Sequence, residues 1–256
     1  MKVLILYFSG TGNTKYVANL IHDEMKSMGF QTEIHSIEDE FTIAADSYDL
    51  LVLGSPKYYE YPPFYFMEYL KKNLPNCREM IPTMMFCTQV SPLTTDFKGI
   101  EKMLRRKNHK LMVEKSVPIA NNMVIFSAFP PTDLKKLQAN IENLQSQMKP
   151  LLSEFSNGTV IHERPKWILA VVEQLVARIC TGLFPVFAMK YSASSQCTGC
   201  GLCAKMCPEK NIKLQDERPV FGRKCLFCMR CINQCPENAI LYDNKQCHQY
   251  KLTIKK

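Results

Sequence analysis

One cysteine pattern constrains this chain more than any other feature, because it occurs twice between Cys197 and Pro236. Both copies read C-x2-C-x2-C-x3-C-P, and each cysteine of the second copy lies 28 positions after its counterpart. The cysteines of the first copy are Cys197, Cys200, Cys203 and Cys207, and those of the second are Cys225, Cys228, Cys231 and Cys235. The repeat also includes other residues, since Glu209 recurs as Glu237. The doubled run therefore predicts two equivalent metal centres.

The chemistry of the run favours iron–sulfur clusters. Four thiolates suit zinc or an iron–sulfur cluster, but zinc sites usually pair two C-x2-C knuckles across a longer gap. The run resembles that of bacterial two-cluster ferredoxins over about residues 190–245, and in that family the fourth cysteine ligates the other cluster. The resemblance implies two [4Fe–4S] clusters, one on Cys197, Cys200, Cys203 and Cys235 and one on Cys225, Cys228, Cys231 and Cys207. Zinc and disulfides remain the alternatives.

Composition limits the number of domains and indicates the cellular compartment of the protein. A chain of 256 residues with 46% hydrophobic content can form one large domain or two modest ones. Eight of the 12 cysteines lie in the repeat, and the others are scattered at Cys77, Cys87, Cys180 and Cys247. Met1-Lys2 leads directly into an apolar strand pattern, so we expect no signal peptide. Reduced thiols and oxygen-labile clusters fit a cytoplasmic, anaerobic setting.

The net charge of +8 is concentrated in the cysteine-rich half. Residues 190–256 contain 12 Lys and Arg against 5 Asp and Glu, a balance of +7, and the remaining residues have a balance of +1. Clusters ligated by four thiolates are negatively charged, so this basic surplus mostly offsets bound cofactors. We therefore expect no nucleic-acid binding, although a weakly basic docking face remains.

The N-terminal stretch predicts an anion site. An apolar strand over residues 2–8 leads into Ser9-Gly10-Thr11-Gly12-Asn13-Thr14, and a helical pattern follows. A strand, a polar glycine loop and a helix together direct backbone N–H groups and hydroxyls at a phosphate. A dinucleotide fingerprint would need glycine at Lys15, and the loop is too short for a Walker A motif. No direct NAD(P) site is evident.

This loop resembles the FMN phosphate loop of flavodoxins. The resemblance implies that FMN phosphate is bound by Ser9, Gly10, Thr11, Gly12, Asn13 and Thr14. It also implies that the loops after the next two sheet strands border the flavin, which gives Ser55, Pro56, Lys57, Tyr58, Tyr59, Thr88 and Gln89 as candidates. Tyr58 or Tyr59 would stack on the ring. For either tyrosine, packing against the following helix is the alternative.

The remaining pattern alternates strands and helices. We expect strands over residues 31–37, 49–54, 81–88 and 110–118, and the last of these is expected to be the final strand of the sheet. We expect helices over about 94–107 and from 134 to a stop at Asn157-Gly158. Residues 120–131 are irregular, and the sequence does not decide whether they border the flavin pocket. The predicted fold class is α/β, a flavodoxin-like doubly wound parallel sheet followed by a small α+β two-cluster ferredoxin domain.

Residues 163–189 are apolar but too interrupted for a membrane span, since the longest charge-free run is 11 residues. We expect two amphipathic segments hinged near Gly182 and Pro185. They pack on the first domain as a linker, or they contact a membrane surface or a partner. The predicted division is a flavodoxin-like domain over 1–158, a helical linker over 159–189 and a ferredoxin-like domain over 190–256.

Overall, the chain resembles the flavodoxin–ferredoxin fusion proteins of anaerobic bacteria. The resemblance implies electron transfer between two clusters and FMN. Two functions remain open: a carrier that docks to redox partner proteins, and an FMN-dependent oxidoreductase that reduces or dehydrogenates a small molecule with electrons supplied through the clusters. The histidines are scattered, and the sequence shows no acid–base set beside the flavin loops, which favours the carrier. Catalytic residues, and therefore enzyme status, stay undetermined.

Overall fold

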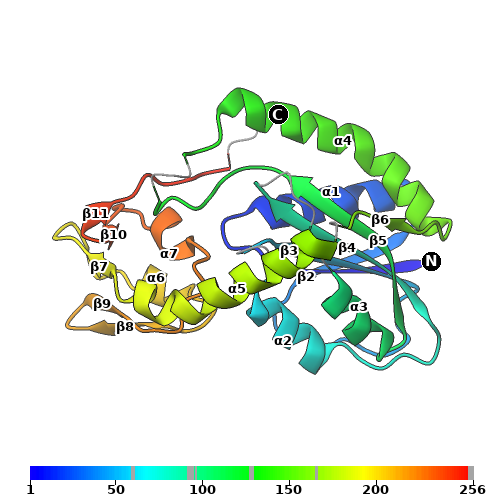
Figure 1. The fold of residues 1–256 in the computed structure, drawn as a ribbon, viewed down its shortest axis with the longest axis horizontal. Coiled ribbons are helices and arrows are strands. Elements are labelled where there is room, and N and C mark those ends of the chain that lie inside the picture. The colour runs from blue at the N-terminus through cyan, green and yellow to red at the C-terminus, as the bar shows by residue number, and fades with distance from the viewer. Residues whose placement is uncertain (59–60, 91–94, 96, 127–129, 165–166, 253–256) are drawn as a thin grey trace.

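The computed structural model describes residues 1–58, 61–90, 95, 97–126, 130–164 and 167–252. A parallel sheet with helices on both faces forms one end of the molecule, and short strands and helices form the other (Figure 1). Helix α5 (Trp167–Ala188) lies between these two parts in the chain.

The large sheet has the strand order β2-β1-β3-β4-β5-β6, and all of its pairings are parallel. Its first five strands are β1 (Lys2–Tyr7), β2 (Gln31–Ser36), β3 (Leu50–Pro56), β4 (Ile81–Gln89) and β5 (His109–Pro118). The apolar run of β3 is buried at every position, as expected for a strand covered on both faces. Each predicted strand is present, with ends that differ by one or two residues.

Two cores sandwich this sheet. Helices α1 (Asn13–Ser27) and α4 (Leu134–Ser156) cover one face through side chains such as Val17, Ile21 and Ile141. Helices α2 (Phe64–Asn73) and α3 (Lys98–Arg105) cover the other, with Phe66 and Leu104 fully buried. This arrangement confirms the predicted doubly wound fold.

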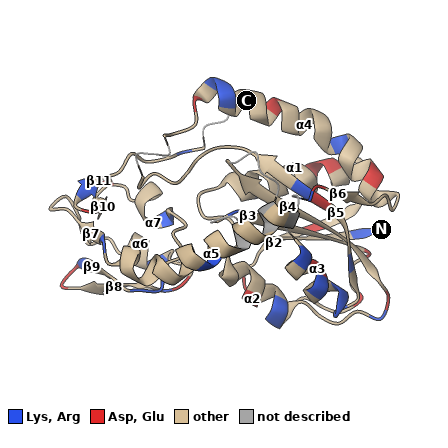
Figure 2. Cartoon of the chain, in the orientation of Figure 1, with Lys and Arg blue, Asp and Glu red and all other residues tan. Residues whose placement is uncertain are grey.

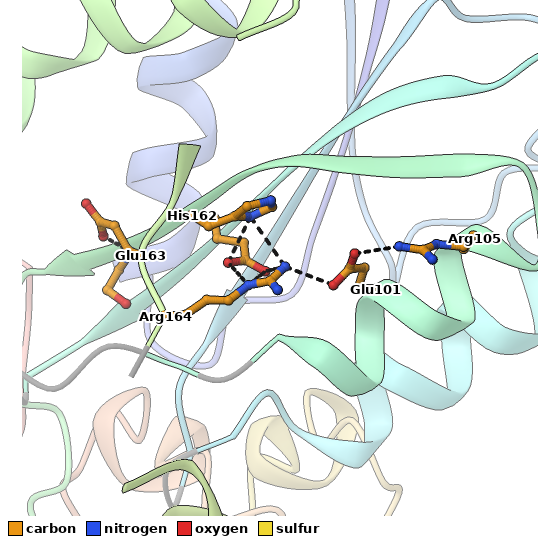
Figure 3. Close-up of polar contacts among 7 residues, drawn as sticks. Glu101, Arg105, His162, Glu163 and Arg164 are labelled. Atoms are coloured by element: carbon orange, nitrogen blue, oxygen red, sulfur yellow. Dashed lines mark hydrogen bonds and ion pairs between the residues drawn. The ribbon is translucent and has the colours of Figure 1, made fainter. Parts of the chain in front are cut away.

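A sixth strand, β6 (Ile161–His162), corrects the prediction that residues 110–118 form the last strand. It pairs with β5 at Val113 and Glu114. Arg164, two residues after the end of β6, forms a bidentate pair with the fully buried carboxylate of Glu114 at 2.8–3.1 Å. Arg164 also reaches Glu101 on α3 (Figure 3). A two-residue strand that contains a histidine has no apolar pattern, so this ion-pair network fixes β6 together with the packing of Ile161 on the core.

The helices after β5 agree only in part with expectation. α4 starts at the N-cap Asp133, whose carboxylate accepts from two backbone N–H groups, and ends at Asn157-Gly158 as predicted. α5 is one continuous helix instead of two hinged segments. Pro185 lies in its last turn, where it removes little of the hydrogen-bond ladder. None of the described helices is long and apolar enough to cross a membrane.

The outer side of α5 is unusually apolar. Most of its length is free of Lys, Arg, Asp and Glu (Figure 2). At least 40% of the residue surface is exposed at each of Ile168, Val171, Val172, Leu175, Val176, Ile179, Leu183 and Val186. The structure thus leaves a stripe of apolar side chains on this helix without a cover.

The small C-terminal part contains β7 (Tyr191–Ala193), β8 (Ile212–Gln215), β9 (Arg218–Phe221), β10 (Ile240–Tyr242) and β11 (Lys245–Gln246). Its helices α6 (Leu202–Lys205) and α7 (Arg230–Asn233) lie inside the two cysteine runs. The repeat is visible in the backbone, because φ is positive at the equivalent pairs Gly199 and Phe227, Gly201 and Met229, and Lys210 and Asn238. The 28-residue sequence repeat therefore produces two copies of one backbone geometry.

Candidate cofactor sites

The loop between β1 and α1 has the geometry of an anion cradle. Gly12 takes a left-handed conformation with φ 106°, and its Cα faces open space. The Ser9 hydroxyl accepts a hydrogen bond from the Gly12 N–H at 3.1 Å and stabilises the turn. The first turn of α1 leaves backbone N–H groups without intrahelical acceptors, and its dipole favours negative charge. A phosphate placed here would meet N–H and hydroxyl donors.

Side-chain hydrogen bonds join this loop to two other parts of the sheet edge, the end of β4 and the segment after β5. The Thr14 and Thr88 hydroxyls lie 2.8 Å apart, and Asn13 donates to the carbonyl of Ala120 at 3.0 Å. Asn122 donates to the Thr11 hydroxyl at 2.6 Å. The carboxyl ends of β1, β4 and β5 are thereby held together, which is where open α/β sheets bind ligands.

A pocket at this edge gathers most of the predicted flavin residues. It is lined by Ser9, Gly10, Thr11, Asn13, Thr14, Pro56, Lys57, Tyr58, Thr88 and Gln89, together with Val90, Ala120 and Asn122. Gly12 lines the adjoining groove. Ser55 is fully buried, and its hydroxyl donates to the carbonyl of Pro56. Ser55 therefore stabilises the backbone of this loop. Tyr59 lies outside the described residues.

The sequence did not identify Ala120 and Asn122 as site residues. The segment after β5 carries no motif, and its hydrogen bonds with Thr11 and Asn13 place it at the pocket. The donor set, the open space at Gly12 and the lining of the pocket fit FMN, which when bound exchanges one or two electrons.

The eight repeated cysteines fall into two groups that mix the two runs. Cys197, Cys200 and Cys203 of the first run line one small cavity with Cys235 of the second. Burial raises the pKa of the Cys203 thiol, and the proximity of Cys197, Cys235 and Cys200 raises it further.

The second group has the opposite mixture. Burial raises the pKa of Cys225 to about 12 and that of Cys228 to about 11, and Cys207 contributes to both shifts. Burial also raises the pKa of Cys231 well above its ordinary value, with Cys228, Cys225 and Cys207 as the next causes. Such thiols stay protonated at neutral pH, and ligation of a metal centre would be needed to convert them to thiolates.

In the described part of the chain, no three His, Cys, Asp or Glu side chains converge closely enough for a single metal ion. A four-iron cluster is larger than an ion and spreads its thiolates farther apart. The two four-sulfur groups have the donor chemistry of such clusters.

The second cysteine group lies directly against the anion loop. A Cβ added to Gly10 would meet the Cys228 carbonyl oxygen at 2.7 Å, the Cys228 Cβ at 3.2 Å and the Tyr58 hydroxyl. Cys228 and Tyr58 share one buried core with Phe8 at the end of β1. In contrast, Cys200 of the first group is exposed. The first group therefore reaches the surface, while the second adjoins the flavin pocket.

The C-terminal segment makes a second connection between the two parts. The Tyr250 hydroxyl donates to Asn13 in the anion loop at 2.7 Å, and its backbone N–H donates to Asn233 of α7 at 2.6 Å. Tyr250 and Leu252 pack on the core formed by α1 and α4. The chain thus returns across the first domain after completing the second, as the strand-free segment leading from β11 shows (Figure 1).

Comparisons with known proteins agree with this geometry. A family model of the flavodoxin domain matches residues 4–126, and a model of the 4Fe-4S dicluster domain matches residues 196–240. No curated protein matches the chain.

Several solved structures are similar to part of this chain. A flavodoxin from the domain Archaea is 15% identical over 61% of this chain and 99% of its own, with a TM-score of 0.43. Oxidised flavodoxin 1 from Bacillus cereus is 15% identical over 61% and 98%, with a TM-score of 0.44. Rubredoxin oxygen:oxidoreductase from the anaerobe Desulfovibrio gigas is 14% identical over 61% and 36%, with a TM-score of 0.40. These scores are low, and the assignment rests on the strand order and the family models. The chain is a fusion of an N-terminal flavodoxin domain with a C-terminal 4Fe-4S dicluster ferredoxin domain.

Proposed function

We propose that this protein carries electrons between redox partner proteins by way of two [4Fe–4S] clusters and one FMN. An electron-transfer role follows from its two domains. The cluster count, the ligands, the route and the partners are the proposal. The flavin would be held by the Ser9–Thr14 loop and the loops after β3 and β4, and the clusters by the two mixed cysteine groups.

The contact between Cys228 and Gly10 is the observation that carries the route. It brings a cysteine of the second group to the loop that would hold the flavin phosphate. We assign the group of Cys225, Cys228, Cys231 and Cys207 to the flavin-proximal cluster. The group with the exposed Cys200 would exchange electrons with partners.

The lining of the flavin pocket supports a carrier over an enzyme. Among its described lining residues, Lys57 and Tyr58 are the only ionisable ones. A small-molecule oxidoreductase usually fixes its substrate by a few convergent polar groups over the flavin. The oxidoreductase remains the alternative function, and no described contact favours it.

We further propose cytoplasmic redox partners that are acidic, since residues 190–256 carry the basic surplus of the chain. The exposed stripe of α5 remains a proposed contact surface for a partner or for a membrane surface. No nucleic acid and no direct NAD(P) site are part of the proposal.

Anaerobic stopped-flow mixing of the reduced protein with acidic one-electron carriers, across ionic strength, tests this function. The second-order rate should fall as salt is added, because screening weakens steered encounter. Lys205→Gln, at an exposed residue between Cys203 and Cys207, should reduce the salt dependence. Lys149→Gln, at an exposed position of α4, is the control. Saturable, salt-insensitive oxidation by one small organic acceptor would favour the oxidoreductase instead.

A further inference from the structure

Arg230 lies between two cysteines of the second group, Cys228 and Cys231, and opens α7. Its side chain leaves the ferredoxin domain and enters the flavodoxin domain. Its Nε donates to the carbonyl of Gly10 at 3.2 Å, and its Nη2 donates to the carbonyl of Ser9 at 2.8 Å. Both carbonyls belong to the proposed phosphate loop. A single side chain therefore joins the cluster-binding run to the flavin-binding loop.

The remaining N–H groups of the guanidinium are also used. Nη1 donates to the carbonyl of Met206, which precedes Cys207, at 2.9 Å. Nη1 and Nη2 form a fork with the two carboxylate oxygens of Glu38, at 2.8 and 2.6 Å. Arg230 thus directs all five of its donors at the loop, at the Cys207 segment and at Glu38. Lysine has three donors and no fixed plane, so it could not reproduce this set.

Because the Arg230–Glu38 pair is mostly buried, breaking it costs free energy. The side chain of Arg230 is only 14% exposed and that of Glu38 is 25% exposed. Below them the guanidinium carbon lies 5.7 Å from the ring centre of Phe8, at the end of β1. An open groove of about 730 Å³ adjoins the pair and is lined by residues of both domains, including Lys15 and Gln234. Removing either partner would leave a partly buried charge without its counterpart.

We propose that Arg230, paired with Glu38, is the positioning residue that fixes the flavin-proximal cluster against the phosphate loop and so sets the distance for electron transfer to FMN. This inference rests on the proposed function. It adds that the Arg230 guanidinium helps to hold the two domains together. The covalent linker and the Tyr250 contact are the other connections.

Three variants of the full chain separate this role from general stability. Arg230→Gln removes the positive charge and most of the donors, and Arg230→Lys keeps the charge only. Glu38→Gln changes a residue of the flavodoxin domain only, so it leaves the cysteine run intact. It replaces a carboxylate oxygen by an amide donor, which cannot accept from the guanidinium. Arg105→Gln is the matched control, because the exposed Arg105 pairs with Glu101 on the same helix, α3, and lies in no cofactor site.

The first measurement is hydrogen exchange in the FMN-free, cluster-loaded protein. In Arg230→Gln and Glu38→Gln, the backbone N–H groups of residues 9–14 should exchange about thirtyfold faster or more, because loss of one partner weakens a buried charge pair by that order. Arg230→Lys should resemble Arg230→Gln, and Arg105→Gln should resemble wild type. Unchanged exchange in Glu38→Gln would overturn the inference, whether or not Arg230→Gln retains its iron.

The second measurement follows flavin reduction after the clusters are reduced in protein loaded with FMN and iron. Slower flavin reduction in Glu38→Gln and Arg230→Lys, at unchanged FMN and iron content, is expected. If wild type itself transfers no electrons to the flavin, the proposed function fails. If wild type transfers them and Glu38→Gln transfers them equally fast, the positioning role alone fails.

Discussion

Thr11 occupies the most diagnostic position of the anion loop, because its hydroxyl accepts from Asn122 and its backbone follows the Gly10 contact with the second domain. Thr11→Asp places a carboxylate where the FMN phosphate should bind, so like-charge repulsion should release the flavin. The clusters should remain. Absorbance of flavin and of iron–sulfur in the purified variant gives both answers. Thr159→Asp, at an exposed position after α4, should keep its flavin. A variant at Thr11 that holds stoichiometric FMN would relocate the site.

His109 reports on the core of the flavodoxin domain. It is fully buried at the start of β5, and its Nε2 lies 2.9 Å from the Tyr48 hydroxyl. Burial lowers its pKa from 6.5 to about 4. Below pH 6.5 the unfolded chain therefore binds a proton that the folded chain does not, until the pH reaches about 4. Folding stability should fall by about 2 kcal/mol between pH 7 and pH 5 through this residue.

Denaturant unfolding of wild type and His109→Gln at several pH values isolates this contribution. The variant should be less stable at pH 7 but should lose the extra pH dependence. An equal slope for both proteins between pH 7 and pH 5 would assign the effect to other groups.

At the scale of elements, the two cysteine runs and their short helices form one repeated unit. The grouping of Cys207 with Cys225, Cys228 and Cys231 predicts that Cys207→Ala damages the flavin-proximal cluster. Cys203→Ala should damage the other. Electron paramagnetic resonance of the two reduced variants distinguishes the clusters. If both variants lose the same signal, each run holds its own cluster and the crossed assignment is wrong.

Strand β6 depends on the Arg164–Glu114 pair. The Glu114 carboxylate is fully buried and also lies 3.0 Å from His162, whereas Arg164 is 30% exposed. Glu114→Ala removes the bidentate partner of the guanidinium and leaves it the ion pair with Glu101. The change should destabilise the flavodoxin domain by about 2 kcal/mol, a buried-pair cost reduced for the exposure of Arg164. Arg105→Gln, which breaks an exposed pair, should cost less than about 0.5 kcal/mol. Denaturant unfolding compares them, and equal costs would make the pair dispensable.

The elements that the sequence predicted well are those with a local pattern. Buried strands such as β3 are continuous apolar runs, and α4 shows a helical stripe with a polar N-cap and a glycine stop. β6 has two residues and depends on the Arg164–Glu114 pair, whose members are 50 residues apart, so no local pattern marks it. The hinge expected at Gly182 and Pro185 was wrong because a proline in the last turn does not break a helix.

At the scale of the whole molecule, the two domains are joined by contacts that no motif contains. Arg230 is 192 residues from Glu38, and Tyr250 is 237 residues from Asn13. In the sequence, Arg230 and Tyr250 cannot be told from an ordinary surface arginine and tyrosine. The cysteine repeat and the anion loop could therefore be predicted as separate sites, whereas their adjacency through Cys228 and Gly10 required the structure.

Electron flow inside one molecule tests the central claim most directly. Protein purified without oxygen should contain about eight iron, about eight sulfide and one FMN per chain. Its clusters are reduced by a short pulse of reductant, and flavin absorbance is followed over a range of protein concentrations. The account predicts flavin reduction that follows cluster reduction with a rate independent of protein concentration. A rate proportional to protein concentration, or a flavin that stays oxidised beside reduced clusters, would contradict it.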